Sequence, residues 1–515
     1  MAVDASLLAM AAIGGLGLAL SVTAERLLKP RPSLIRPVSA WAAHLALWCA
    51  AYGLMVLLTG RPWCAMLAVT AIVITLVLVN NAKYYSLREP FIFQDYDYFL
   101  DAVRHPRLFL PFLGVRSFLG AAALFLLALV GWLLETPPKA RFDVNGQLGG
   151  GVAMIAAAFL LLWRLKAHAP PLCFDPEKDV RALGLLGSLW AYAVAEGTPP
   201  TGRSPFADYP CRALERLPHL IAVQNESFFD ARALYKGIRP DVLAAFDALQ
   251  AESSLYGPLS VPAWGANTVR TEFAFLTGIT EEKMGAHRFN PYRAVARGWP
   301  VYSLPLFLKS LGYRTVCIHP YWARFYGRDR VLSLLGFDAF MDISVFVGAQ
   351  REGPYVGDMA VGERILHVLR QAACPTFVFA VTMENHGPLH MEAFRPEADR
   401  AFYTVPPPAG CEELAAYLRH LRNADSMLGM LSANVRQAGY PASMCFYGDH
   451  VPIMPSTYKR LQAPEGTVPY LCWSNRSAHI VMAQDNTVSK RSPSITPGSP
   501  LAVRDLALRW LETLL

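Results

Sequence analysis

Five apolar stretches, all before residue 166, constrain the fold of this 515-residue chain more than any other feature. An α-helix needs about 20 apolar residues to cross the roughly 30 Å hydrocarbon core of a bilayer. Most of the stretches reach that length, and the last reaches it with a few flanking residues. The first has no basic leader and no small-residue cleavage site, so we expect a retained anchor. We predict five transmembrane helices, at about 6–28, 40–59, 64–81, 115–134 and 150–164.

The composition agrees with a membrane protein. Hydrophobic residues make up 53% of the chain and charged residues 17%, against roughly 45–50% and about 25% in soluble domains. This balance argues against a purely cytosolic globular enzyme, and 11% aromatic residues argue against disorder. The net charge of +7 is spread without a long Lys/Arg block. We therefore expect an anionic surface such as lipid headgroups as the partner, and no nucleic acid.

The chain after residue 166 has a different pattern. Residues 215–515 show short β-rich runs that alternate with helical patterns, which is typical of an α/β domain. Residues 167–214 are rich in proline and small residues around an apolar piece at 183–195 that is too short to span a bilayer. We predict a transmembrane domain at 1–166, a juxtamembrane linker with an interfacial helix at 167–214, and a large catalytic domain at 215–515.

The orientation of these parts is ambiguous in the charge pattern. Basic residues cluster in the loops after the first and third predicted spans, which by the positive-inside rule would place the large domain in the cytoplasm. Cysteines do not decide the compartment, because the six in the large domain have no framework spacing. The basic residues are Arg26, Lys29, Arg31, Arg36, Lys83, Arg88, Arg104 and Arg107, and the six cysteines are Cys211, Cys317, Cys374, Cys411, Cys445 and Cys472.

Two apolar strands in the large domain end in side chains that can bind a metal ion. The run at 220–227 leads to Glu226, and the run at 443–447 leads through glycine to Asp449 and His450. In open α/β sheets, ligands bind at the carboxyl ends of the strands. A carboxylate and an imidazole suit Mn²⁺, Zn²⁺ or Mg²⁺. Each motif alone also fits a solvated strand end.

A loop of small residues at 265–267 leads into an amphipathic pattern that begins near Thr268. Backbone N–H groups at a helix N-terminus favour bound phosphate. Thr268 could be a metal-activated nucleophile that forms a covalent phospho-enzyme. The alternative is that Thr268 only caps the helix, with Thr271 or Glu272 completing the cap.

Three further polar residues follow or lie near strand ends. His319 comes after the run at 315–318, Arg328 nine residues later, and His386 after the run at 376–382. Two histidines and an arginine provide the hydrogen-bond donors that a phosphoryl group needs during transfer. Each of them alone could be an ordinary surface group.

In their order along the chain, these motifs resemble the lipoteichoic acid synthase group of the alkaline-phosphatase/sulfatase superfamily, which includes phosphoglycerol transferases of periplasmic glucans. The resemblance implies Glu226, Thr268, Asp449 and His450 as metal ligands, with Thr268 also the catalytic nucleophile. It implies substrate-phosphate contacts by His319, Arg328 and His386. The segments that carry it are 226–227, 265–273, His319 with 325–329, 385–386 and 448–450.

The resemblance also implies an architecture and an activity. Members have five N-terminal helices, a linker with interfacial helices and an extracytoplasmic sulfatase-like α/β domain. They use one divalent metal, Mn²⁺ being expected first, and transfer glycerol phosphate from phosphatidylglycerol to a glycan or glycerol phosphate polymer. We therefore expect a multi-pass protein of the bacterial inner membrane with its catalytic domain in the periplasm, against the simple charge count.

The substrate and the reaction leave alternatives open. Related phosphoethanolamine transferases carry cysteines around the nucleophile loop that are absent here, so glycerol phosphate is favoured. The chain differs from the family it resembles at two positions. Members carry an acidic residue where this chain has Tyr321, and often a tryptophan where it has Tyr326. Two alternatives have the same fold: a phosphatase or sulfatase-type hydrolase, and a non-catalytic lipid-binding regulator.

Overall fold

The computed structural model describes residues 2–97, 114–135, 141–210, 217–475 and 499–514. The chain forms two compact units, unit 1 at Met1–Pro199 and unit 2 at Pro200–Leu515. The division falls inside the predicted linker, so most of that linker belongs to unit 1. Arg104, Arg107 and Cys211 lie outside the described residues.

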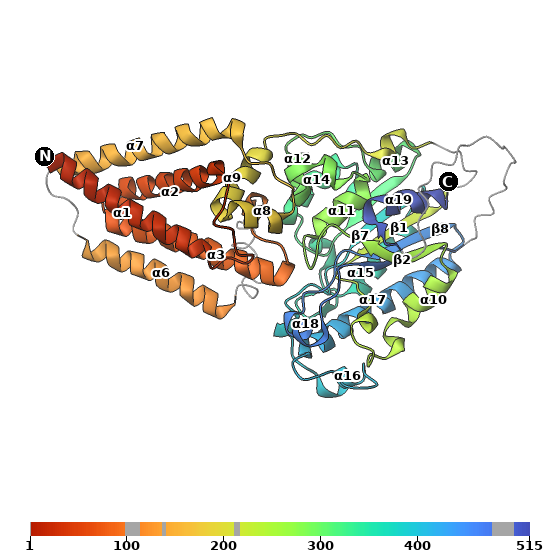
Figure 1. The fold of residues 1–515 in the computed structure, drawn as a ribbon. Helices are drawn as coiled ribbons and strands as arrows, with labels where there is room; N and C mark the ends of the chain where they lie inside the picture. The colour runs from red at the N-terminus through yellow and green to blue at the C-terminus, as the bar shows by residue number, and fades with distance from the viewer. Residues whose placement is uncertain (1, 98–113, 136–140, 211–216, 476–498, 515) are drawn as a thin grey trace. The chain divides into compact units, whose positions relative to one another are not determined.

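Unit 1 contains a helix over each of the five predicted apolar stretches (Figure 1). Four are long and apolar enough to cross a membrane, and the apolar part of the remaining one, Phe118–Leu134, is shorter. The prediction of N-terminal apolar helices is confirmed. The helices are α1 (Ala2–Glu25), α2 (Val38–Thr59), α3 (Pro62–Leu87), α6 (Val115–Leu134) and α7 (Arg141–Leu165).

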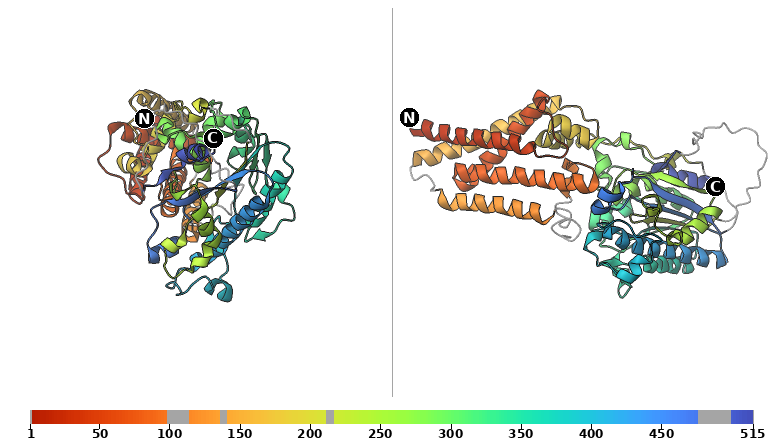
Figure 2. Two further views of the ribbon diagram at one scale, coloured as in Figure 1. Left: turned by 90° about the vertical axis from the view of Figure 1, so that its right-hand side faces the viewer. Right: turned by 60° about the horizontal axis from the view of Figure 1, so that its bottom comes forward.

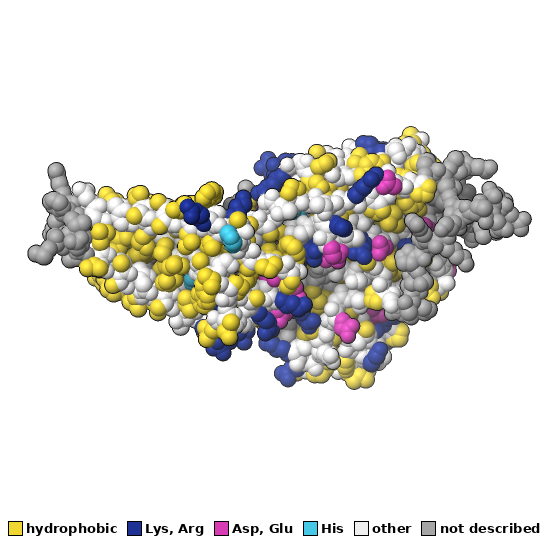
Figure 3. Space-filling view, turned by 45° about the horizontal axis from the view of Figure 1, so that its top comes forward, with side chains coloured by type: hydrophobic (Ala, Val, Ile, Leu, Met, Phe, Trp, Pro, Cys, Tyr) yellow, Lys and Arg dark blue, Asp and Glu magenta, His cyan; other side chains and the backbone are white. Residues whose placement is uncertain are grey.

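The surface of unit 1 is apolar where a soluble bundle would be polar. Figure 3 shows hydrophobic side chains over much of the visible face of this unit. Phe159 and Trp163 of α7 are 66% and 69% exposed. Exposed apolar area of this extent indicates a membrane or protein partner, and the helix lengths favour the membrane.

Two short helices follow α7, namely α8 (Pro176–Leu183) and α9 (Leu185–Ala195). Trp190 of α9 packs in one cluster with Ala43 of α2. The backbone N–H of Leu186 donates to Glu25 Oε1 (3.0 Å), and Arg36 pairs with the same carboxylate at 2.5 Å. Helix α9 is therefore fixed to the helices of unit 1, and its position at a membrane interface stays a prediction.

Unit 2 is built on an eight-stranded mixed sheet in the order β10-β2-β9-β8-β1-β7-β3-β4. Strands β8, β1, β7, β3 and β4 run parallel, while β9 is antiparallel to both β8 and β2. This confirms the predicted α/β domain. The strands are β1 (His219–Asn225), β2 (Leu255–Ser260), β3 (Arg314–Ile318), β4 (Ala339–Met341), β7 (Thr376–Val381), β8 (Ala442–Gly448), β9 (Val468–Ser474) and β10 (Leu501–Ala502), with β5 (Arg351–Glu352) and β6 (Tyr355–Val356) in a separate two-stranded sheet.

Helices cover both faces of the large sheet (Figures 1 and 2). Phe446 of β8 contacts Phe246 of α10 on one face, while Tyr447 stacks on Phe275 of α11 on the other, with ring centroids 4.9 Å apart. Burial on both faces explains why the central strands read as continuous apolar runs. The helices are α10 (Ala244–Glu252), α11 (Thr268–Thr277), α12 (Pro291–Ala296), α13 (Leu304–Ser310), α14 (Arg328–Leu334), α15 (Asp358–Arg370), α16 (Pro396–Arg400), α17 (Glu412–Gln437), α18 (Pro455–Leu461) and α19 (Val503–Glu512).

The strand ends fall where the sequence predicted them. Strand β1 ends at Asn225, directly before Glu226, and β8 ends at Gly448, directly before Asp449. Helix α11 begins at Thr268. The sheet therefore carries the predicted site residues at the carboxyl ends of its parallel strands, where ligands bind in open α/β sheets.

Candidate active site

The register between β1 and β8 brings the first three site residues together. Asn225 pairs with Gly448, so Glu226 and Asp449 leave the two strands at the same level. A Cβ at Gly448 would lie 2.1 Å from the carbonyl oxygen of Phe228, which is closer than a real contact allows. Glycine at this position therefore lets the chain after β1 approach the end of β8.

Glu226, Asp449 and His450 form a buried cluster of candidate ligands. Each offers one ligand atom within 4.8 Å of the others. His450 Nε2 lies 3.6 Å from Glu226 Oε1 and 3.3 Å from Asp449 Oδ2. The three side chains are at most 3% exposed.

The charges of this cluster fit a divalent cation. Burial and the charge of Asp449 raise the pKa of Glu226 to about 8, although His450 opposes the shift. Burial also raises the pKa of Asp449, against the effect of His450. Asp449 Oδ2 is buried and has no hydrogen-bond partner among the residues that the structure describes. Two buried carboxylates and an imidazole offer the oxygen and nitrogen ligands that Mn²⁺ or Zn²⁺ prefers, so the residues present fit such an ion.

Thr268 is the first residue of α11 and lines the same pocket as Glu226 and His450. Asn267 holds the N-cap position with left-handed backbone (φ 67°), and no side chain caps the helix. The alternative that Thr268 is only an N-cap is therefore wrong. The Thr271 hydroxyl donates to the carbonyl oxygen of Asp449 (2.8 Å) and fixes the first turn of α11 to the ligand cluster.

The structure brings all seven predicted site residues together. Six of them line one pocket, and Asp449 completes the adjoining ligand cluster. The sheet thus brings together residues that are far apart in the sequence, such as Glu226 and His450, which are separated by 224 positions. The pocket is lined by Glu226, Ala266, Asn267, Thr268, His319, Phe325, Tyr326, Arg328, Met383, His386 and His450.

Arg328 is held in the pocket wall by Glu272 of α11. The fully buried guanidinium pairs with both carboxylate oxygens of Glu272 and lies over the ring of Tyr326, 5.2 Å from its centroid. Glu272 also accepts a hydrogen bond from the Tyr292 hydroxyl (2.7 Å). From the sequence, Glu272 enters only through the alternative in which Thr271 or Glu272 completes a cap. Its position four residues after Thr268, on the same face of the helix, is the signal that could have placed it in the site.

Two histidines of the pocket, His319 and His386, form different hydrogen bonds. His319 Nδ1 faces the carbonyl of Val381 (3.1 Å), so this nitrogen carries the proton, and Nε2 accepts from Arg328 Nη1 at 3.2 Å. Burial and the charge of Arg328 lower the pKa of His319. His386 Nδ1 donates to the carbonyl of Gly387 (2.8 Å), and burial lowers its pKa. In this arrangement His319 orients Arg328; its contact with a substrate phosphate stays a prediction.

A buried polar network that the sequence did not reveal lies beside β1. Asn225 Nδ2 donates to Asp358 Oδ2 (2.7 Å), and the Asp358 amide donates to Glu384 (2.6 Å). Burial and the charge of Glu384 raise the pKa of Asp358 to about 8. Burial lowers the pKa of His420, but its bonds to Glu384 and Glu392 outweigh this and raise it to about 9. No motif links these residues, since they come from four separate segments.

Comparison with known proteins decides the family. The sulfatase family profile matches residues 218–495, more than half of the chain. The chain belongs to the sulfatase family. This confirms the superfamily that the motifs indicated, whose members are generally metal-dependent.

The chain is also similar to curated proteins and to solved structures. The chain is 26% identical over 348 residues to a putative cyclic beta-1,2-glucan modification protein of Rhizobium meliloti (strain 1021), covering 60% of this chain and 51% of the relative. The chain spans about half the length of the curated relatives it matches. It is also similar to the phosphoglycerol transferase GacH of Streptococcus pyogenes, solved with sn-glycerol-1-phosphate, with 20% identity, a TM-score of 0.46, and coverage of 59% of this chain and 76% of that chain.

A third similarity covers most of the chain, including its apolar N-terminal part. The integral membrane protein lipooligosaccharide phosphoethanolamine transferase A (EptA) of Neisseria meningitidis is 13% identical, with a TM-score of 0.51 and coverage of 88% of each chain. At this identity the match shows the fold alone. It confirms a fold of apolar N-terminal helices followed by a sulfatase-like domain.

The raised pKa of Glu226 predicts how cation affinity depends on pH. Below about pH 8 the cation-free carboxyl holds a proton that must leave when a divalent ion binds. Affinity for Mn²⁺ should therefore rise about tenfold per pH unit up to pH 8 and level off above it. Calorimetric titration of chelator-treated protein at pH 6, 7, 8 and 9 measures this slope. A constant affinity between pH 6 and 8 would show that Glu226 is already ionised.

Proposed function

We propose that the protein is a membrane-anchored, metal-dependent phosphotransferase that moves glycerol phosphate from phosphatidylglycerol to a glycan or glycerol phosphate polymer. The observation that carries the proposal is that Thr268 lines the same pocket as Glu226 and His450, which form a cluster of candidate metal ligands with Asp449. Membership of the sulfatase family supports a phosphotransferase-type enzyme.

Glu226, Asp449, His450 and Thr268 would hold the metal. A divalent cation bound there would supply Lewis acidity, which lowers the pKa of a nearby hydroxyl and stabilises charge on the phosphoryl group. Thr268 Oγ then forms a bond to phosphorus, and the diacylglycerol oxygen leaves with a proton. In the second half-reaction an acceptor hydroxyl takes the group from Thr268 and restores its hydroxyl.

The pocket wall supplies the remaining positive charge. Arg328 is buried and held by Glu272, so its guanidinium needs little reorganisation to meet a phosphoryl oxygen. His319 keeps Arg328 in place by accepting from Nη1. We assign His319, Arg328 and His386 to the substrate phosphate, with Arg328 as the principal charge and His319 acting through Arg328.

The charges of the pocket favour a neutral headgroup. Among the described residues that line it, the single carboxylate is that of Glu226, which belongs to the metal cluster. An ethanolamine headgroup would bring an ammonium group that lacks an anionic partner there, and an unpaired charge is costly to desolvate. Glycerol brings hydroxyls, which the polar side chain of Asn267 on the pocket wall can meet. We therefore prefer glycerol phosphate to phosphoethanolamine as the transferred group.

A glycan is the acceptor that the comparisons support. The curated relative is described as a putative glucan modification protein. Transfer from a phospholipid to such a glycan requires the catalytic unit on the outer face of the inner membrane. Exposed basic residues such as Lys29 and Arg31 would then lie against anionic headgroups, each contributing up to about 1 kcal/mol of surface attraction, whereas Arg36 and Lys83 are already paired with carboxylates.

The decisive assay is release of diacylglycerol from fluorescent phosphatidylglycerol by purified protein with Mn²⁺. Thr268→Val should abolish release because it keeps the shape of the side chain and removes the nucleophile. Thr268→Ser is the matched control and should retain measurable turnover, since it keeps the hydroxyl. Full activity of Thr268→Val would contradict the mechanism.

The same assay separates the competing functions. A parallel reaction with phosphatidylethanolamine tests the headgroup, and faster turnover of that lipid would favour phosphoethanolamine transfer. When the phosphatidylglycerol also carries a radiolabel in its glycerol headgroup, adding cyclic glucan should move that radiolabel from free glycerol phosphate to the glucan. Release that never reaches the glucan would favour a hydrolase, and no release from either lipid would favour a regulator.

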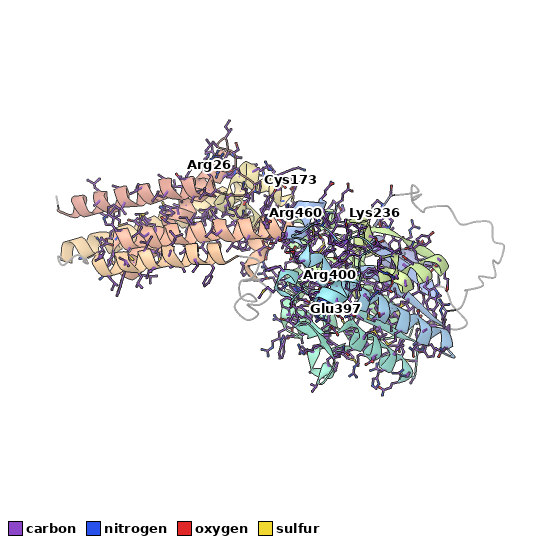
Figure 4. All side chains as sticks on the ribbon, turned by 90° about the horizontal axis from the view of Figure 1, so that it is seen from below. Arg26, Cys173, Lys236, Glu397, Arg400 and Arg460 are labelled. Atoms are coloured by element: carbon purple, nitrogen blue, oxygen red, sulfur yellow. The ribbon has the colours of Figure 1, made fainter. Side chains whose placement is uncertain are left out.

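The location of unit 2 is tested by labelling from outside the cell. Lys236 is exposed on unit 2 (Figure 4), so Lys236→Cys should react with a membrane-impermeant maleimide in intact spheroplasts. The background replaces the exposed Cys173 and Cys374 by serine, together with Cys211. Labelling that appears only after lysis would place unit 2 in the cytoplasm and support the charge count instead.

A further inference from the structure

Ser227, the residue directly after Glu226, has an unusual backbone. Its φ angle is 53°, in the left-handed region that residues with a Cβ avoid. Such conformations persist only where the surroundings hold them, and they concentrate at functional sites. Two more residues of this site, Asn267 and Tyr326, also have positive φ. What holds Ser227 is therefore a question about the site itself.

The backbone of Ser227 is fixed from two sides. Its N–H donates to Asp449 Oδ1 at 2.8 Å. Its carbonyl oxygen accepts from the hydroxyl of Tyr417 on α17, also at 2.8 Å. The left-handed turn thus points the amide of Ser227 at one candidate ligand, and leaves Asp449 Oδ2 free to face His450 Nε2.

The side chain of Ser227 joins the other two candidate ligands. Its hydroxyl donates to Glu226 Oε1 at 2.9 Å and lies 3.3 Å from His450 Nδ1. That nitrogen also faces the carbonyl oxygen of Val451 at 3.1 Å. A carbonyl can only accept, so Nδ1 carries the proton and the serine oxygen accepts from it. His450 Nε2 is then the nitrogen that faces the carboxylates of Glu226 and Asp449 and is placed to bind a metal ion.

We propose that Ser227 is the positioning residue of the metal site. Its hydroxyl holds the ring of His450 and the rotamer of Glu226, while its amide orients Asp449, so one residue bonds to all three members of the cluster. This inference rests on the proposed function, because it presumes that the cluster binds a divalent ion. Loss of a group that orients metal ligands typically weakens metal affinity by about 10–100-fold.

Two substitutions separate the hydroxyl from the backbone turn. Ser227→Ala removes the hydroxyl and keeps the strained φ, whereas Ser227→Gly removes the hydroxyl and relieves the strain. Both keep the amide that bonds to Asp449. If the hydroxyl matters, both variants should bind Mn²⁺ about 10–100-fold more weakly than the wild type. If the turn alone matters, Ser227→Gly should bind like the wild type.

The measurement is calorimetric titration of the chelator-treated full chain in detergent with Mn²⁺, beside a thermal melt without metal. We expect equal weakening in the two variants, a melting temperature for Ser227→Gly no lower than that of the wild type, and recovery of diacylglycerol release at excess Mn²⁺. Wild-type affinity in either variant would overturn the role of the hydroxyl. A wild type that binds no divalent ion would instead overturn the proposed metal site, and this inference with it.

Discussion

The parallel pairing of β1 with β8 is the constraint on which the site depends. Both strands end at the same level, so Glu226 lies beside Asp449 and His450, and all three residues are buried. A carboxylate pair of this kind is unfavourable without a compensating positive charge, as the raised pKa of Glu226 shows. A register shift of one residue would turn every side chain of β1 to the other face. The pairing of β1 with β8 therefore determines which candidate ligands meet, before any loop contributes.

The rest of unit 2 holds this unfavourable arrangement in place. Apolar residues cover both faces of the sheet, with Phe275 stacked on Tyr447 on the face that carries Thr268. Glu272, on the same helix, offsets the buried charge of Arg328. Helix α11 therefore positions the nucleophile at its first residue, carries the counter-ion of the pocket arginine one turn later, and anchors itself in the core through its apolar side.

The sequence predicted those parts of the protein that follow from local pattern. Apolar length predicted the helices of unit 1, and alternating β-rich runs predicted the α/β domain. Strand ends predicted Glu226 and Asp449, because strands β1 and β8 are long, apolar and abruptly terminated. Local pattern also selected Thr268, His319, Arg328 and His386, to which the resemblance of motifs then gave expected roles, and these four residues line one pocket.

What the sequence could not predict depends on contacts between distant segments. The partner of Arg328 is 56 residues away, and the amide of Ser227 bonds to a carboxylate 222 residues away. The network of Asp358, Glu384 and His420 likewise joins separate segments that share no motif. The left-handed backbone of Ser227 could not be predicted from the sequence either, because serine prefers other conformations. Orientation across the membrane is a property of the whole loop environment, and a charge count alone does not fix it.

The central claim is that Thr268 carries the transferred group during turnover. Rapid acid quenching of protein mixed with phosphatidylglycerol and Mn²⁺, followed by proteolysis and mass spectrometry, tests it most directly. The account predicts that the peptide containing Thr268 gains the mass of one glycerophosphoryl group, which disappears when a glycan acceptor is added before the quench. Turnover with that peptide unmodified at every time point, or the same modification on a different residue, would contradict it.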